Sequence, residues 1–121
     1  MDGNLFQNHE KRKFDRKQLY YYLKVYHDQN STLAGYLGDI STKGLMLFTK
    51  ESVELDKVFH FRINLDQEFG MDADLVVEAR SLWCEPDANP EYVAMGFKFS
   101  ALDAASLDRV KYLIKKYGFE Q

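Results

Sequence analysis

Apolar and polar residues alternate along most of this chain, and the alternation constrains its fold more than any other feature. It is clearest over residues 57–65, where one face carries four apolar side chains: Phe59, Phe61, Ile63 and Leu65. A period of two is typical of a β-strand with one buried face. The same pattern predicts strands over residues 18–28, 71–84 and 91–100, and two apolar runs on either side of a polar turn predict strands over residues 32–40 and 44–49. Residues 85–90 contain both prolines of the chain and are predicted to form a loop.

The period changes near the C-terminus. Apolar residues there recur three and four positions apart, which is typical of an amphipathic helix. They are Leu107, Val110, Leu113, Ile114 and Tyr117. Asp103 can cap the start of this helix and Gly118 can end it. Lys115 and Lys116 favour its negative end.

Six or seven strands followed by one helix predict an all-β dominated fold. We expect a small six- to seven-stranded antiparallel β-barrel with one C-terminal α-helix, because closure removes exposed strand edges and the helix can cover an open end. The length of 121 residues fits one domain. Residues 1–9 are polar and are expected to be a flexible N-terminal segment, and residues 10–121 are expected to form the barrel domain.

The location of the protein is predicted from what the sequence lacks. Cys84 is the single cysteine, so no internal disulfide can form. The chain has no signal peptide, and we therefore expect it in the reducing cytoplasm. No apolar run of about 18 residues is present, which predicts no membrane insertion.

Charge narrows the class of ligand. The net charge of −3 argues against binding to a nucleic acid polymer. Residues 11–17 nevertheless hold five cations and one acidic residue. A concentrated cationic segment on an acidic protein indicates a small anionic ligand, although a solvated N-terminal arm would have the same composition.

A short polar segment, residues 39–44, separates two apolar runs and predicts a tight hairpin. Asp and Ser side chains accept hydrogen bonds from nearby backbone N–H groups, and Gly44 can take a positive φ without steric cost. Gly38 directly precedes Asp39 and marks either a β-bulge or the close approach of another group. Turn chemistry alone accounts for each of these residues taken singly.

Taken together with an upstream pair of arginines, the segment resembles a known family. Arg12 and Arg16 form Arg-x-x-x-Arg, and Asp39, Ser41 and Gly44 form Asp-x-Ser-x-x-Gly. This two-part motif resembles that of the PilZ domain, a bacterial receptor module for cyclic di-GMP. The resemblance covers residues 10–118. It extends to a tryptophan strand, a loop and then Gly-Phe before the helix, at Trp83 and Gly96-Phe97. The family fold is a β-barrel with a C-terminal helix.

The resemblance implies roles for the motif residues. Arg12 and Arg16 would grip phosphate and guanine from a flexible N-terminal arm, because an arginine fork matches both groups. Asp39 and Ser41 would hydrogen-bond a guanine and its neighbouring groups, and Gly44 would shape the loop.

Two further residues belong to the predicted site. Lys11 occupies the position before the first arginine that influences ligand number in the family, so one ligand or a stacked pair is allowed. Trp83 is either a stacking wall for a base or a residue that fills the core.

Catalysis is not indicated. His9, His27 and His60 have no metal-ligand spacing to one another or to Cys84. No phosphate-binding Gly-rich loop, Gly-x-Ser-x-Gly or pairing of a nucleophile with a base is present. We therefore expect a protein that is not an enzyme and that has no metal and no cofactor.

The resulting prediction is a cytoplasmic bacterial receptor for the second messenger cyclic di-GMP. Ligand would order the arm at residues 11–17, and an unidentified downstream partner protein would read the change. Family analogy suggests motility, adhesion or biofilm control. Two alternatives remain. One is a ligand-independent adaptor that acts by protein contacts, and the other is an oligonucleotide-binding barrel that uses the basic arm and the tyrosine-rich first strand as a stacking platform.

Overall fold

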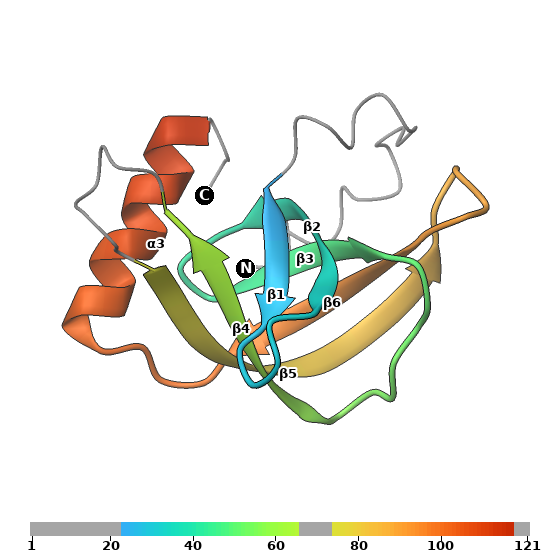
Figure 1. Cartoon of the computed structure of the whole chain (residues 1–121), viewed down its shortest axis with the longest axis horizontal. Helices are drawn as coiled ribbons and strands as arrows, with labels where there is room; N and C mark the ends of the chain where they lie inside the picture. The colour runs from blue at the N-terminus through green and yellow to red at the C-terminus, as the bar shows by residue number, and fades with distance from the viewer. Residues whose placement is uncertain (1–22, 66–73, 118–121) are drawn as a thin grey trace.

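The computed structural model describes residues 23–65 and 74–117 of the chain (Figure 1). These residues form six strands followed by one helix. The elements are β1 (Lys24–His27), β2 (Leu33–Ile40), β3 (Gly44–Thr49), β4 (Val58–Asn64), β5 (Asp74–Pro86), β6 (Val93–Phe99) and α3 (Ala104–Tyr117).

The six strands close into a barrel in the order β1-β2-β3-β6-β5-β4. Every neighbouring pair is antiparallel. The predicted antiparallel barrel with one C-terminal helix is therefore confirmed.

Most strand boundaries agree with the alternation in the sequence, and β3 agrees at both ends. The predicted first strand is observed from Lys24 onward, because residues 18–22 lie outside the described part. The predicted loop at residues 85–90 was wrong at its start. Glu85 and Pro86 still pair with Ala94 and Val93 of β6. Pro86 has no N–H to donate to the ladder, and it occupies the last position of β5, where the ladder ends.

Alternate residues of each strand point into the barrel and form its core. Phe61, Ile63, Leu75, Val77 and Met95 are almost completely buried, as their positions in the alternation predict. The rings of Phe59, Phe61 and Phe97 meet in this core, with Phe61 and Phe97 in an edge-to-face arrangement at 4.9 Å. Such aromatic packing contributes about 0.5–1.5 kcal/mol beyond the burial of area.

Helix α3 covers one end of the barrel (Figure 1). Its buried residues Val110 and Leu113 belong to the same core as the strands. Asp103 caps the helix, because its Oδ1 accepts the Ser106 N–H at 2.8 Å. Arg109 ties the helix to β5 by donating to the Asp74 carbonyl oxygen at 2.8 Å. Among the described residues, the helix is α3, and it is neither long enough nor apolar enough to cross a bilayer.

Candidate functional site

The connection between β2 and β3 forms a tight hairpin, as predicted. The Ser41 N–H donates to the Gly44 carbonyl oxygen at 2.9 Å and closes the turn. The Lys43 N–H donates to Ser41 Oγ at 3.0 Å. The predicted turn chemistry of Ser41 is therefore confirmed. We refer to residues 39–44 as the hairpin corner.

Asp39 faces the outside of the barrel because β2 carries a bulge. The register shifts between Leu37 and Asp39, so that Leu37 and Ile40 both point into the core. Asp39 then pairs with the outward-facing Met46. Its side chain is 5% exposed, and its Oδ1 accepts the Ile40 N–H at 2.9 Å. The bulge thus places a buried carboxylate on the outer face of the barrel, at the point where β2 ends.

Gly38 serves both uses predicted for it, as part of this bulge and as a point of close approach. A Cβ at this position would lie 2.7 Å from Phe48 Cε2 and 2.9 Å from Met46 Sδ. Any side chain would therefore displace Phe48 and Met46, which lie beside Asp39.

Gly44 is required by its neighbour on β6 and not by a left-handed turn. Its φ lies outside the left-handed region, contrary to the expectation of a positive φ. A Cβ at Gly44 would lie 2.1 Å from the Phe97 carbonyl oxygen. The glycine therefore lets β6 approach the hairpin corner, where the Phe99 N–H donates to the Lys43 carbonyl oxygen at 2.9 Å.

Trp83 lies on the same outer face as Asp39. Strand register aligns Asp39 with Met46, Met46 with Gly96, and Gly96 with Trp83 across four strands. A Cβ on Gly96 would meet the indole at 2.1 Å, so the Trp83 ring lies over Gly96 and leans toward the hairpin corner. The two roles predicted for Trp83 are therefore compatible, because one face of its half-buried ring packs on the barrel.

Trp83 belongs to a small apolar group outside the barrel, which we call the outer cluster. Met46, Phe48, Tyr92 and Ala94 are its buried members, and Tyr36 and Trp83 pack against them. A cluster on the outer face of a barrel is unusual, since this face normally carries polar side chains. It gives the surface beside Asp39 an aromatic and apolar character.

Two cations neighbour the hairpin corner, and the sequence analysis did not identify them. Gly44 pairs with Lys98 on β6, and Lys98 pairs with Arg80 on β5. Lys98 and Arg80 are exposed and lie on the outer face. Their pair is two residue pairs along the β5–β6 ladder from the pair of Gly96 and Trp83. Arg80 also pairs with the carboxylate of Asp56 at 3.1 Å. Only the order of the strands brings these cations to Gly44, so local sequence contains no signal for them.

The predicted residues of the N-terminal arm lie outside the described part of the chain. Lys11, Arg12 and Arg16 are among them, as is the flexible segment at residues 1–9. Among the residues that are described, three members of the predicted site lie at the hairpin corner, namely Asp39, Ser41 and Gly44.

A metal centre has no support in the described ranges 23–65 and 74–117. No group of three His, Cys, Asp or Glu side chains there is arranged to hold a metal ion. His60 lies 3.3 Å from a carboxylate oxygen of Glu78 on the exposed face of β4 and β5. Burial, followed by the negative charge of Glu85, raises the pKa of the Cys84 thiol.

Comparison with known proteins gives the following matches. The family model described as the PilZ domain matches residues 10–116. The structure of the Bacillus subtilis inhibitor of motility MotI/DgrA is similar with a TM-score of 0.56 and 18% identity, over 79% of this chain and 46% of that chain. The chain thus spans less than half the length of the Bacillus structure.

The PilZ domain of YcgR from Escherichia coli, solved with c-di-GMP, is similar with a TM-score of 0.57 and 14% identity. This match covers 78% of this chain and 79% of that chain. No curated protein matches the sequence. At these identities the two structural matches concern the fold.

Proposed function

The chain belongs to the PilZ domain family, and from this premise we propose that it is a receptor for cyclic di-GMP with its site at the hairpin corner. One observation carries the proposal. The register of four strands aligns a carboxylate, Asp39, with a broad aromatic ring, Trp83, on one outer face. The YcgR domain that shares the fold was solved with this ligand.

The chemistry of the hairpin corner suits a guanine. The Asp39 carboxylate can accept hydrogen bonds from the N–H donors on one edge of the base. The Trp83 ring lies over Gly96 and is therefore two strand spacings, or about 10 Å, from the backbone of β2. A base stacked on Trp83 could direct its edge toward Asp39. Stacking of a base on an aromatic side chain contributes about 1–3 kcal/mol.

The phosphates of the ligand would meet positive charge from two directions. Lys98 and Arg80 lie beside Gly44 on the outer face. Arg12 and Arg16 would approach from the N-terminal arm and form bidentate contacts with phosphate or guanine. Lys11 would add a further cation, and the ligand would be either one molecule or a stacked pair.

Ordering of the arm would be the signal. When residues 11–17 close on the ligand, their charge is neutralised and the surface around the outer cluster changes. An unidentified partner protein in the bacterial cytoplasm would bind the changed surface. Because the similar Bacillus protein is named an inhibitor of motility, we propose motility as the regulated process, with biofilm formation as a second candidate.

Isothermal titration with cyclic di-GMP tests this function. We expect wild-type protein to bind, and Asp39→Asn to bind about 10–100-fold more weakly, because a charge-assisted hydrogen bond is worth about 1.5–3 kcal/mol. The asparagine keeps the side-chain oxygen that accepts the Ile40 N–H. Arg12→Ala and Arg16→Ala should weaken binding to a similar extent.

A matched control is Glu54→Gln. It removes one carboxylate whose side chain is 78% exposed, in the connection between β3 and β4. Unchanged affinity in Asp39→Asn and both arginine variants would eliminate the proposed site. A folded wild-type protein without any binding would instead support the alternative of a ligand-independent adaptor.

A further inference from the structure

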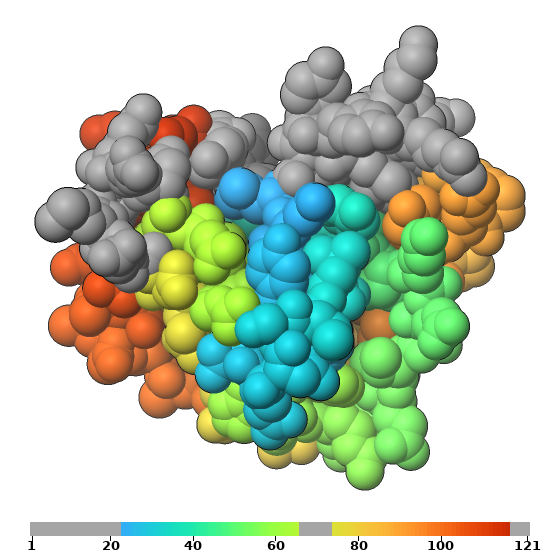
Figure 2. All heavy atoms as spheres, viewed as in Figure 1, coloured from blue at the N-terminus to red at the C-terminus, as the bar shows by residue number. Residues whose placement is uncertain are grey.

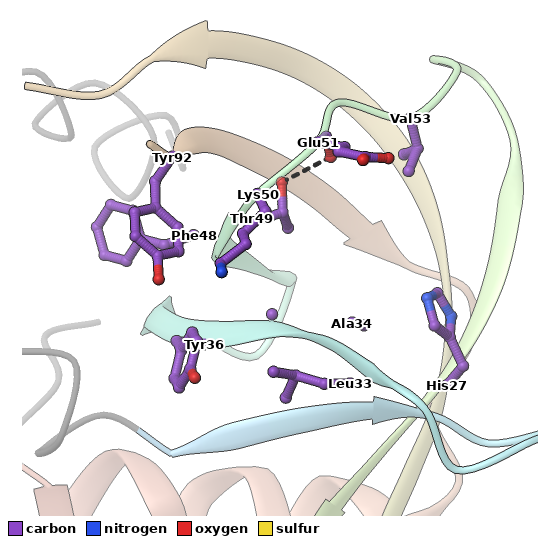
Figure 3. A pocket seen from close by; sticks show the side chains of 11 residues that line it. His27, Leu33, Ala34, Tyr36, Phe48, Thr49, Lys50, Glu51, Val53 and Tyr92 are labelled. Carbon is purple, nitrogen blue, oxygen red and sulfur yellow. Dashed lines mark hydrogen bonds between the residues drawn. The ribbon is translucent and has the colours of Figure 1, made fainter. Parts of the chain in front are cut away.

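A pocket opens on the outside of the barrel, at the end of β2 and β3 away from the hairpin corner. Pairing of these strands begins at Tyr36 and Phe48, and beyond that pair the chain after β3 turns away from β2. The resulting cavity has a volume of about 380 Å³ (Figure 3). Figure 2 shows the hollow between the cyan atoms of β2 and the green atoms of the segment after β3.

The opening is built into the strands. The register of β1 and β2 shifts at Val25 and Tyr26, so β2 bends at its start. Gly35 then contacts β3 so closely that a Cβ would lie 2.6 Å from the Phe48 carbonyl oxygen. Directly after this contact the Thr49 hydroxyl donates to the Glu51 carbonyl oxygen at 3.0 Å, which fixes the turn of the chain away from β2.

One wall of the pocket is aromatic. Tyr36, Phe48 and Tyr92 line it, and all three also belong to the outer cluster. Phe48 is 1% exposed and Tyr92 is 6% exposed, so packing holds their rings in place. Leu33 and Val53 add apolar surface. Tyr36 is half-buried and packs against these covered rings, so among the three it is the ring that is open to a ligand.

The charges around the pocket are distributed unevenly. Lys50 directs its ammonium group into the pocket on the side of Tyr36 and Tyr92 (Figure 3). No carboxylate among residues 23–65 and 74–117 forms an ion pair with Lys50. The Glu51 carboxylate lies beside Val53, away from Lys50 (Figure 3). His27 also lines the pocket. An anionic group is therefore favoured beside Lys50, at the end near Tyr36, and disfavoured near Glu51.

We propose that this pocket is a second ligand site, which binds a planar ring that carries one anionic group. The ring would pack on the accessible side chains of Tyr36 and Leu33, and the anion would pair with Lys50. An aromatic carboxylic acid and a mononucleotide share this chemistry, and both are small enough for the cavity. No residue of the hairpin corner lines the pocket, so the proposal does not depend on cyclic di-GMP binding.

Amide spectra of ¹⁵N-labelled full-length protein test the proposal with three probes: phenylacetate, its neutral analogue phenylacetamide, and guanosine monophosphate. We expect phenylacetate or guanosine monophosphate to shift the resonances of Gly35, Tyr36 and Lys50 in a saturable manner. Phenylacetamide should bind about two- to fivefold more weakly than phenylacetate, because it lacks the charge that pairs with Lys50. Whichever anion binds more tightly identifies the source of the ligand.

Two lysine variants separate a specific pocket from general attraction to positive charge. Lys50→Met should weaken binding of the anion about fivefold. Lys57→Met removes a comparable exposed charge outside the pocket, beside Glu54, and should leave binding unchanged. Three results would each overturn the proposal: no saturable shift with either anion, equal binding of phenylacetate and phenylacetamide, or unchanged binding in Lys50→Met.

Discussion

Replacing Gly44 by alanine tests whether the hairpin corner is held by the close approach of β6. The new Cβ would lie 2.1 Å from the Phe97 carbonyl oxygen and 3.2 Å from Lys98 Cα. Carbon and carbonyl oxygen atoms in a sheet approach to about 3.3 Å, so β3 and β6 must separate by about 1.2 Å. The 2.9 Å hydrogen bond from the Phe99 N–H to the Lys43 carbonyl oxygen would then stretch beyond bonding distance.

The expected cost combines overpacking with the loss of this hydrogen bond. Together these effects should lower the free energy of unfolding by about 2–4 kcal/mol. For a domain of this size the melting temperature would fall by roughly 10 °C. Urea unfolding followed by circular dichroism measures the change, and fluorescence of Trp83, the single tryptophan, provides a second probe.

Two further variants make the test specific. Thr42→Ala lies in the same turn and should change stability by less than about 0.5 kcal/mol. A glycine kept for a left-handed turn would be replaced better by asparagine than by alanine, because asparagine tolerates that conformation. If the close approach of β6 is the reason for the glycine, the larger asparagine side chain gives no advantage. Gly44→Asn should then be at least as destabilising as Gly44→Ala. Wild-type stability in Gly44→Ala, or a clear advantage of asparagine, would refute the reasoning.

Three other changes have definite expected outcomes. Ser81→Ala removes a buried hydroxyl that bonds the backbone of the β3–β4 connection at 2.7 and 3.1 Å, and should lower the free energy of unfolding by about 1–3 kcal/mol in urea titration. Gly96→Ala should displace the Trp83 ring and shift its fluorescence emission, whereas an unchanged spectrum would contradict the packing described. Asp103→Ala removes the cap of α3 and should lower the melting temperature. Hydrogen bonds from Ser106 hold the pKa of Asp103 below its usual value of about 4. The stability difference from wild type should therefore be complete at pH 7 and should shrink as the pH falls from about 4 through the lower pKa of the folded protein.

Local sequence patterns predict much of this fold because the responsible interactions are local. The apolar run at residues 45–48 after a polar turn indicates β3, and the position of Asp103 before an amphipathic run identifies the cap of α3. The hairpin at residues 41–43 follows from polar residues between two apolar runs. Each of these features depends on side chains within a few positions of one another.

The candidate site depends on contacts between distant strands, which local patterns do not contain. The bulge between Leu37 and Asp39 reverses the alternation and turns Asp39 outward. Gly44 was expected to be needed for the conformation of a turn, but it is needed because the Phe97 carbonyl oxygen of β6 leaves no room for a Cβ. Lys98 and Arg80 reach the hairpin corner only because β6 lies between β3 and β5 in the barrel.

The location of the bound ligand tests the central claim most directly. Amide and indole N–H resonances should be followed while cyclic di-GMP is added to ¹⁵N-labelled wild-type protein. We predict the largest saturable shifts at Asp39, Ser41, Gly44, Gly96 and the indole N–H of Trp83. Saturable binding that leaves these five resonances in place and shifts others would contradict the site at the hairpin corner, and the absence of any shift would contradict the receptor function.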